Sequence, residues 1–117
     1  MSRPQRGEVN WLNFDPATGA EMKAVHPCVV VQNDAGNRHS DLTIVAAITS
    51  NVRAARLPVG VLVLAGTAGL TRDSVVHCGH VYSVDQARLG ALIGQMPTEY
   101  VDQIDQALVQ SLGLPHS

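Results

Sequence analysis

The 117-residue sequence lacks an apolar run long enough to cross a membrane, and its first residues do not form the apolar core of a signal peptide. We therefore expect a cytoplasmic protein. Cysteine is scarce, since Cys28 and Cys78 are the two in the chain and both lie in strand-like apolar segments. This favours buried thiols over a disulfide. Repeats, low-complexity stretches and linkers are also missing, so we expect residues 1–117 to form one domain.

Charge is sparse as well, at 15% of residues with a formal net charge of −2. This balance excludes a strongly basic protein whose overall field attracts nucleic acid. The segment from Pro97 onward contains Glu99, Asp102 and Asp105 but no Lys or Arg, which leaves seven of the ten acidic residues to balance all eight basic ones. A local basic groove therefore fits the composition. Apolar residues make up 45% of the chain, an excess that favours a subunit interface.

Short apolar segments between turn-forming residues predict a mainly β fold. The clearest are the β-branched segments Pro27–Gln32 and Leu42–Thr49, joined by a polar link at Ala35–Leu42. They are predicted to be neighbouring strands, with His26 and Thr49 at ends that converge on one rim of a sheet. Pro58 and Gly60 indicate an edge or bulged strand. The other expected strands are Glu8–Phe14, Leu57–Leu64, Ser74–Val84 and Ala91–Met96.

One amphipathic helix is expected at residues 97–112. Val101, Ile104, Leu108 and Leu112 recur at helical spacing, and Gly113 can cap the C-terminus. Short strands followed by a single helix predict a small, strongly curved antiparallel barrel with the helix packed on it.

The order and spacing of several short motifs resemble the MazF/PemK toxins of bacterial toxin–antitoxin pairs. The likeness runs from about Arg6 to Leu114, nearly the whole chain. The motifs are Arg6-Gly7-Glu8-Val9, Asp15-Pro16 with Gly19 and Glu21, His26-Pro27, Val29 to Asp34, Ala47 to Ser50, Leu57-Pro58, Gly69-Leu70, Asp73-Ser74-Val75, Val84-Asp85, Arg88-Leu89 and Ile93-Gly94.

This resemblance implies an SH3-like (CcdB/PemK-type) antiparallel barrel that forms a homodimer. It also implies a sequence-specific endoribonuclease that cleaves single-stranded mRNA without a metal or other cofactor. A MazE-like antitoxin would inhibit it by placing a flexible tail in the RNA groove. No role for a membrane is implied.

Metal-free RNA cleavage uses the substrate's 2′-hydroxyl as nucleophile and leaves a 2′,3′-cyclic phosphate and a 5′-hydroxyl. In the family, an arginine before the proline of the second strand and a threonine ending the third are credited with this chemistry. The corresponding residues here are His26 and Thr49. Histidine lacks the permanent charge and two-pronged phosphate fit of arginine, but it transfers protons near neutral pH. Without the resemblance, His26 is equally a strand-end histidine bonded to a backbone carbonyl, and Thr49 an ordinary strand residue.

The remaining candidate residues are expected to bind RNA. Arg53 and Arg56 either lie in a solvated loop or contact phosphates in place of an arginine missing from the late strand, where His80-Val81-Tyr82 replaces the Gln-Ile-Arg of relatives. Phe14 is expected to stack on a base, and the loops 15–25 and 52–57 to select bases. The full set is Phe14, Asp15, Lys23, Asn33, Ser50, Arg53, Arg56, Leu57, Pro58, His80 and Tyr82.

Two further side-chain groups are interpreted structurally. Trp11 is expected in the core. The motif His77-Cys78-Gly79-His80 contains metal-ligand types, but strand periodicity sends His77 and His80 to opposite faces, so we expect no shared metal ion unless the strand is bulged.

A non-enzymatic function is the alternative. A catalytically degenerate toxin fold would bind an antitoxin, or a protein target such as a topoisomerase as CcdB does, without cleaving RNA. The retained Thr49 favours the enzyme, and the absent arginine favours the binding protein.

Overall fold

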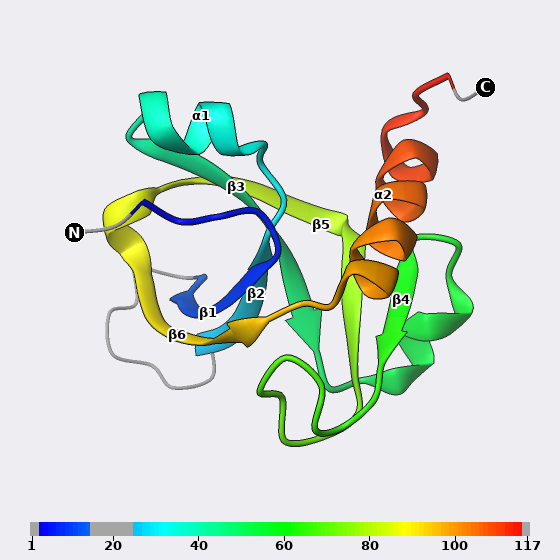
Figure 1. Cartoon of the computed structure of the whole chain (residues 1–117). Helices are drawn as coiled ribbons and strands as arrows, with labels where there is room; N and C mark the ends of the chain where they lie inside the picture. Colours follow the sequence, from blue (N-terminus) through cyan, green and yellow to red (C-terminus); the bar gives the residue numbers. More distant parts are fainter. Residues whose placement is uncertain (1–2, 15–24, 116–117) are drawn as a thin grey trace.

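A computed structural model describes residues 3–14 and 25–115 and contains one curved antiparallel sheet (Figure 1). The strand order is β4-β5-β3-β2-β1-β6. In the described part of the chain the edge strands β4 and β6 are not paired, so the sheet is curved without closing into a barrel. The strands are β1 (Glu8–Asn13), β2 (Val25–Val30), β3 (Leu42–Thr49), β4 (Gly60–Val63), β5 (Ser74–Asp85) and β6 (Leu89–Gln95).

The expected C-terminal helix is confirmed as α2 (Thr98–Leu112), and Gly113 caps it in the left-handed conformation at φ 68°. Within the polar link between β2 and β3 lies α1 (Asp34–His39), a helix that the sequence analysis did not predict. A 3₁₀ helix, Val52–Arg56, precedes the expected edge strand, which begins only at Gly60 because residues 57–59 form a turn in which the Gly60 N–H donates to the Leu57 carbonyl at 3.0 Å. A second 3₁₀ helix, Gln86–Arg88, links β5 to β6. No helix among the described residues is long and apolar enough to span a membrane.

Apolar side chains are buried on both faces of the curved sheet. The larger core lies under α2, where Ile104 and Ala107 pack with residues that include Val76 and Cys78. The smaller core lies on the other face and consists of Leu12, Cys28, Val30, Val45 and Val84. Both cysteines are free and buried, as expected. Burial raises the pKa of Cys28 to about 12, and burial together with the charge of Asp105 raises that of Cys78 to about 11.

Arg6 ties α2 to the sheet. Its Nη2 forms an ion pair with Asp105 Oδ1 of α2 at 2.5 Å, and its Nε donates to the Val31 carbonyl at 2.8 Å. One of the three acidic residues of the C-terminal segment is therefore already neutralised within the fold.

The prediction that Trp11 belongs to the core is wrong, because its side chain is 45% exposed. Trp11 lies opposite Pro27 near the end of β1. Helix α2 packs on β4 and β5 and reaches the start of β1, where Val9 is buried in the same core, but Trp11 lies two residues further along, and nothing in the described chain covers this indole fully.

Candidate active site

The ends of β2 and β3 bring His26 and Thr49 to one rim of the sheet. Cys28 pairs with Ala47 and Val30 with Val45. Continuing this antiparallel register by two residues places His26 opposite Thr49. Both side chains project from the face of the smaller core, because residues two apart on a strand share a face. The expected pairing of the two strands is confirmed, and the convergence of their ends follows by extending the register.

The Thr49 hydroxyl is oriented by the chain that follows it. Its Oγ1 accepts a hydrogen bond from the Asn51 backbone N–H at 3.1 Å. The hydroxyl proton is therefore left to be donated to a ligand, such as a phosphate oxygen. The side chain is half-buried, so its orientation is restrained while solvent still reaches it.

Aromatic rings lie next to His26 and extend the candidate site along the sheet, away from the rim. The Phe14 ring lies 6.2 Å from the His26 ring and 5.2 Å from the Tyr82 ring, the latter in an edge-to-face arrangement. Tyr82 lies opposite Val45 on the same face. Three of the predicted residues, which are distant in sequence, thus form one surface with both ring faces and hydrogen-bonding groups, as single-stranded RNA recognition requires.

His77 and His80 share one side of β5, which overturns the expectation of opposite faces. Ala46 pairs with Val81 but the next residue, Ala47, pairs with His77, so three residues of β5 bulge out. The two imidazole rings stack with centroids 3.8 Å apart and planes 1° from parallel. Because His77 lies opposite Ala47, it projects from the same face as Thr49. Among the described residues no group of three or more His, Cys, Asp and Glu side chains is arranged to hold a metal ion.

The sequence analysis did not select His77 as a site residue. The available signal was Gly79, since a glycine within a strand often marks a bulge. A Cβ at position 79 would lie 2.8 Å from His77 Cε1, so the position of the ring depends on this glycine.

The two predicted arginines follow the rim directly. Arg53 and Arg56 are exposed on the 3₁₀ helix, whose first turn is capped by Asn51 Oδ1 accepting from the Arg53 N–H at 3.2 Å. Leu57 and Pro58 follow and are also exposed. This segment packs on β4 and β5, and it places two permanent positive charges near the end of β3 in an otherwise weakly charged protein.

Other predicted residues lie elsewhere. Asn33 caps α1, with its Oδ1 accepting from the Gly36 N–H at 2.8 Å. Ser50 lines a separate cavity of about 230 Å³ together with Trp11 and Pro27. Asp15 and Lys23 lie outside the described residues.

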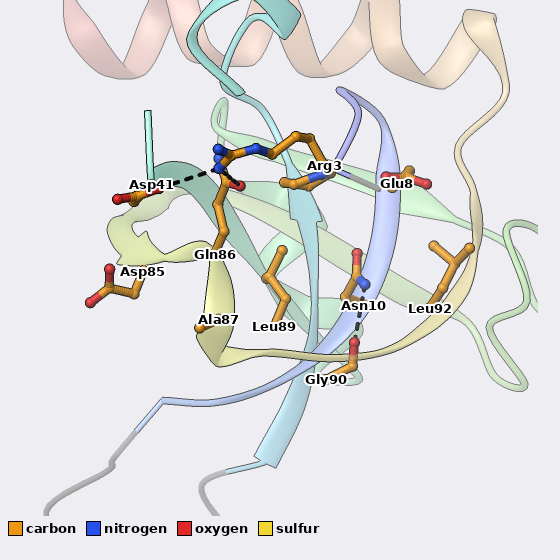
Figure 2. A pocket seen from close by; sticks show the side chains of 11 residues that line it. Arg3, Glu8, Asn10, Asp41, Asp85, Gln86, Ala87, Leu89, Gly90 and Leu92 are labelled. Carbon is orange, nitrogen blue, oxygen red and sulfur yellow. Dashed lines mark hydrogen bonds and ion pairs between the residues drawn. The ribbon is translucent and has the colours of Figure 1, made fainter. Parts of the chain in front are cut away.

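A cavity of about 890 Å³ has a lining that includes neither His26 nor Thr49 (Figure 2). Arg3 crosses it and donates to Gln86 Oε1 at 2.9 Å and to the Ser40 carbonyl at 3.0 Å. Its lining also contains three carboxylates, those of Glu8, Asp41 and Asp85. Net negative charge disfavours phosphate, so the cavity does not qualify as the candidate active site despite its size.

Comparisons with known proteins find similarity along nearly the whole chain. Residues 5–112 match the family described as PemK-like, MazF-like toxin of type II toxin–antitoxin system. The chain is 40% identical over 110 residues to endoribonuclease EndoA of Bacillus subtilis (strain 168), covering 94% of this chain and 95% of the relative.

Solved structures share the fold. The crystal structure of MazF (Form-I) from Deinococcus radiodurans is 26% identical, with a TM-score of 0.76 and coverage of 97% of this chain and 99% of that one. An endoribonuclease in complex with its cognate antitoxin from Mycobacterial species is 24% identical, with a TM-score of 0.79 and coverage of 97% and 99%.

Proposed function

The chain belongs to the PemK-like, MazF-like toxins of type II toxin–antitoxin systems, and we propose that His26 and Thr49 form its catalytic centre. It is an endoribonuclease toxin whose partners are an RNA substrate, a cognate antitoxin and a second copy of itself. The observation that supports this assignment is the register of β2 and β3, which, extended by two residues beyond the Cys28–Ala47 pair, would bring His26 opposite Thr49. The cytoplasm, where mRNA is found, is the proposed location.

The reaction we propose is cleavage of single-stranded RNA by its own 2′-hydroxyl without a metal ion. His26 accepts the 2′-hydroxyl proton as the oxygen attacks phosphorus, a role suited to an exposed imidazole near neutral pH. Thr49 donates its hydroxyl proton to a non-bridging oxygen and stabilises the phosphorane, because Asn51 already fills its acceptor side. The products are a 2′,3′-cyclic phosphate and a 5′-hydroxyl.

The nucleotides on either side of the cleaved bond are proposed to bind the surfaces next to the rim. Phe14 and Tyr82 offer ring faces to bases, and Arg53 and Arg56 offer positive charge to phosphates. The positive charge is local and small, so binding is expected to weaken only modestly with salt, because few counterions are released.

The test is cleavage of a long mixed-sequence single-stranded RNA by the purified protein in EDTA. Wild type is expected to make discrete cuts that leave 2′,3′-cyclic phosphate ends. Thr49→Ala is expected to lower the rate by about 100-fold or more, as for loss of an oxyanion donor, and Thr49→Ser to restore most of it.

Two outcomes would contradict the proposal. Absence of cuts from folded wild-type protein over a range of pH would favour the non-enzymatic alternative. Cuts that disappear in EDTA and return with added Mg²⁺ would overturn the metal-free chemistry while leaving the endoribonuclease in place.

A further inference from the structure

The stacked pair His77 and His80 lies beside the proposed catalytic centre and has no role in the chemistry described so far. His77 lies opposite Ala47, which shares its face of β3 with Thr49 two residues further along. Thr49 and His77 are therefore diagonal neighbours on adjacent strands, a relation that brings side chains within mutual reach of one small ligand. His80 is exposed and stacks on His77 from the bulge.

The pair is built to hold one proton and not two. Parallel rings 3.8 Å apart repel strongly when both are charged. His77 is the member kept neutral, because its Nδ1 accepts the Gly79 backbone N–H at 3.1 Å. Burial, and then the charge of His80, lower the pKa of His77 below its ordinary value. His80 is the exposed ring of the pair, so it is the member that can present a proton to a bound ligand.

The electrostatic surroundings favour an anion at this place. β3 and β4, which flank β5, carry no charged residue. The 3₁₀ helix packed on β5 carries Arg53 and Arg56, and His26 lies across the rim. The acidic residues of α2 are on a helix that covers the other face of the sheet, where Asp105 is paired with Arg6. A phosphate of RNA is the anion that the proposed function supplies.

Resting on that function, we propose that the His77–His80 pair is the general acid of the cleavage reaction. As the 2′-oxygen bonds to phosphorus, the bond from phosphorus to the 5′-oxygen breaks, and His80 gives its ring proton to the leaving 5′-oxygen. His26 holds the proton taken from the 2′-hydroxyl. His26 then releases its extra proton to water and His80 takes one up from water. This restores the starting state, so protons balance without any other reactant. His77 is a positioning residue that holds the His80 ring by stacking.

The experiment compares two substrates at a cleavage site mapped with the wild-type protein. One is the ordinary RNA, and the other has sulfur in place of the bridging 5′-oxygen at the cleaved bond. A thiolate leaves without a proton, so loss of a general acid slows cleavage of the oxygen substrate alone. The variants are His80→Gln, His77→Ala and the double variant His77→Ala/His80→Gln, with His39→Gln on α1 as the matched control.

We expect His80→Gln to cleave the oxygen substrate about 100-fold or more slowly than wild type and the sulfur substrate at close to the wild-type rate. His77→Ala should show a smaller loss with the same dependence on the leaving group. The double variant should be no slower than His80→Gln, because His77 acts through His80. His39→Gln should match wild type on both substrates.

The results that overturn this inference differ from those that overturn the function. If wild type cleaves and His80→Gln loses activity equally on both substrates, or loses none, the pair is not the general acid although the endoribonuclease stands. If the losses of rate in the two single variants add up in the double variant, His77 does not act through His80, and its positioning role is excluded. If folded wild type cleaves neither substrate, the proposed function itself fails.

Discussion

Replacing Gly79 by alanine should displace the stacked histidines while leaving the stability of the fold almost unchanged. Gly79 does not adopt a positive φ, so alanine is compatible with the backbone, and its effect arises from contact alone. The new Cβ would lie 2.8 Å from His77 Cε1 and 3.1 Å from Nδ1. Nonbonded carbons prefer at least about 3.5 Å, so the ring must move by about 0.7 Å. This breaks the hydrogen bond from Gly79 and shifts the stack with His80.

The substitution should lower the catalytic rate far more than it lowers the free energy of unfolding. Losing this one exposed hydrogen bond lowers the free energy of unfolding by at most about 0.5–1.5 kcal/mol. A displacement near 1 Å in catalytic machinery can lower the rate by about 100-fold. We would measure kcat on a fluorescent RNA containing the mapped site and stability by urea denaturation, with Ser83→Ala further along β5 as control. A wild-type kcat in Gly79→Ala, with a displaced His77 ring resonance in the NMR spectrum, would refute the catalytic role of the pair.

Three other predictions concern stability and reactivity. Gly60→Ala should destabilise the fold by about 3 kcal/mol in urea denaturation, because its Cβ would lie 2.1 Å from the Ala54 carbonyl oxygen; a loss below about 1 kcal/mol would contradict this close packing. Cys28 and Cys78 should resist a thiol reagent at pH 8 until urea unfolds the protein, because burial keeps both thiols protonated; rapid labelling of the native protein would be the contrary result. Because the pKa of His77 is lowered on folding, the unfolded state binds more protons, and the free energy of unfolding should fall as pH drops below the ordinary value of about 6.5. His77→Ala should lose this part of the pH dependence in melting experiments from pH 7.5 to 5, whereas an unchanged dependence would assign it to another group.

Local patterns were sufficient for most elements of the fold. β-branched segments bounded by turn residues predicted β2, β3 and β5, and helical spacing predicted α2 with its Gly113 cap. The convergence of His26 and Thr49 also followed from sequence, because two antiparallel strands joined by a short link bring opposite chain ends to one rim. α1 was missed because its six residues, including a glycine, lack apolar periodicity, and its stability depends on capping by Asn33 and on buried Asn37.

The sequence by itself determined which residue types the site contains and which two strand ends carry the proposed catalytic pair. Tertiary structure alone decided that His77 stacks on His80 beside Thr49, and that Trp11 is exposed. Strand periodicity is a local rule, whereas a bulge is defined by how one strand pairs with another, here β5 with β3. Likewise, hydrophobicity favours burying an indole, but the reach of α2 across the sheet decides which positions are covered.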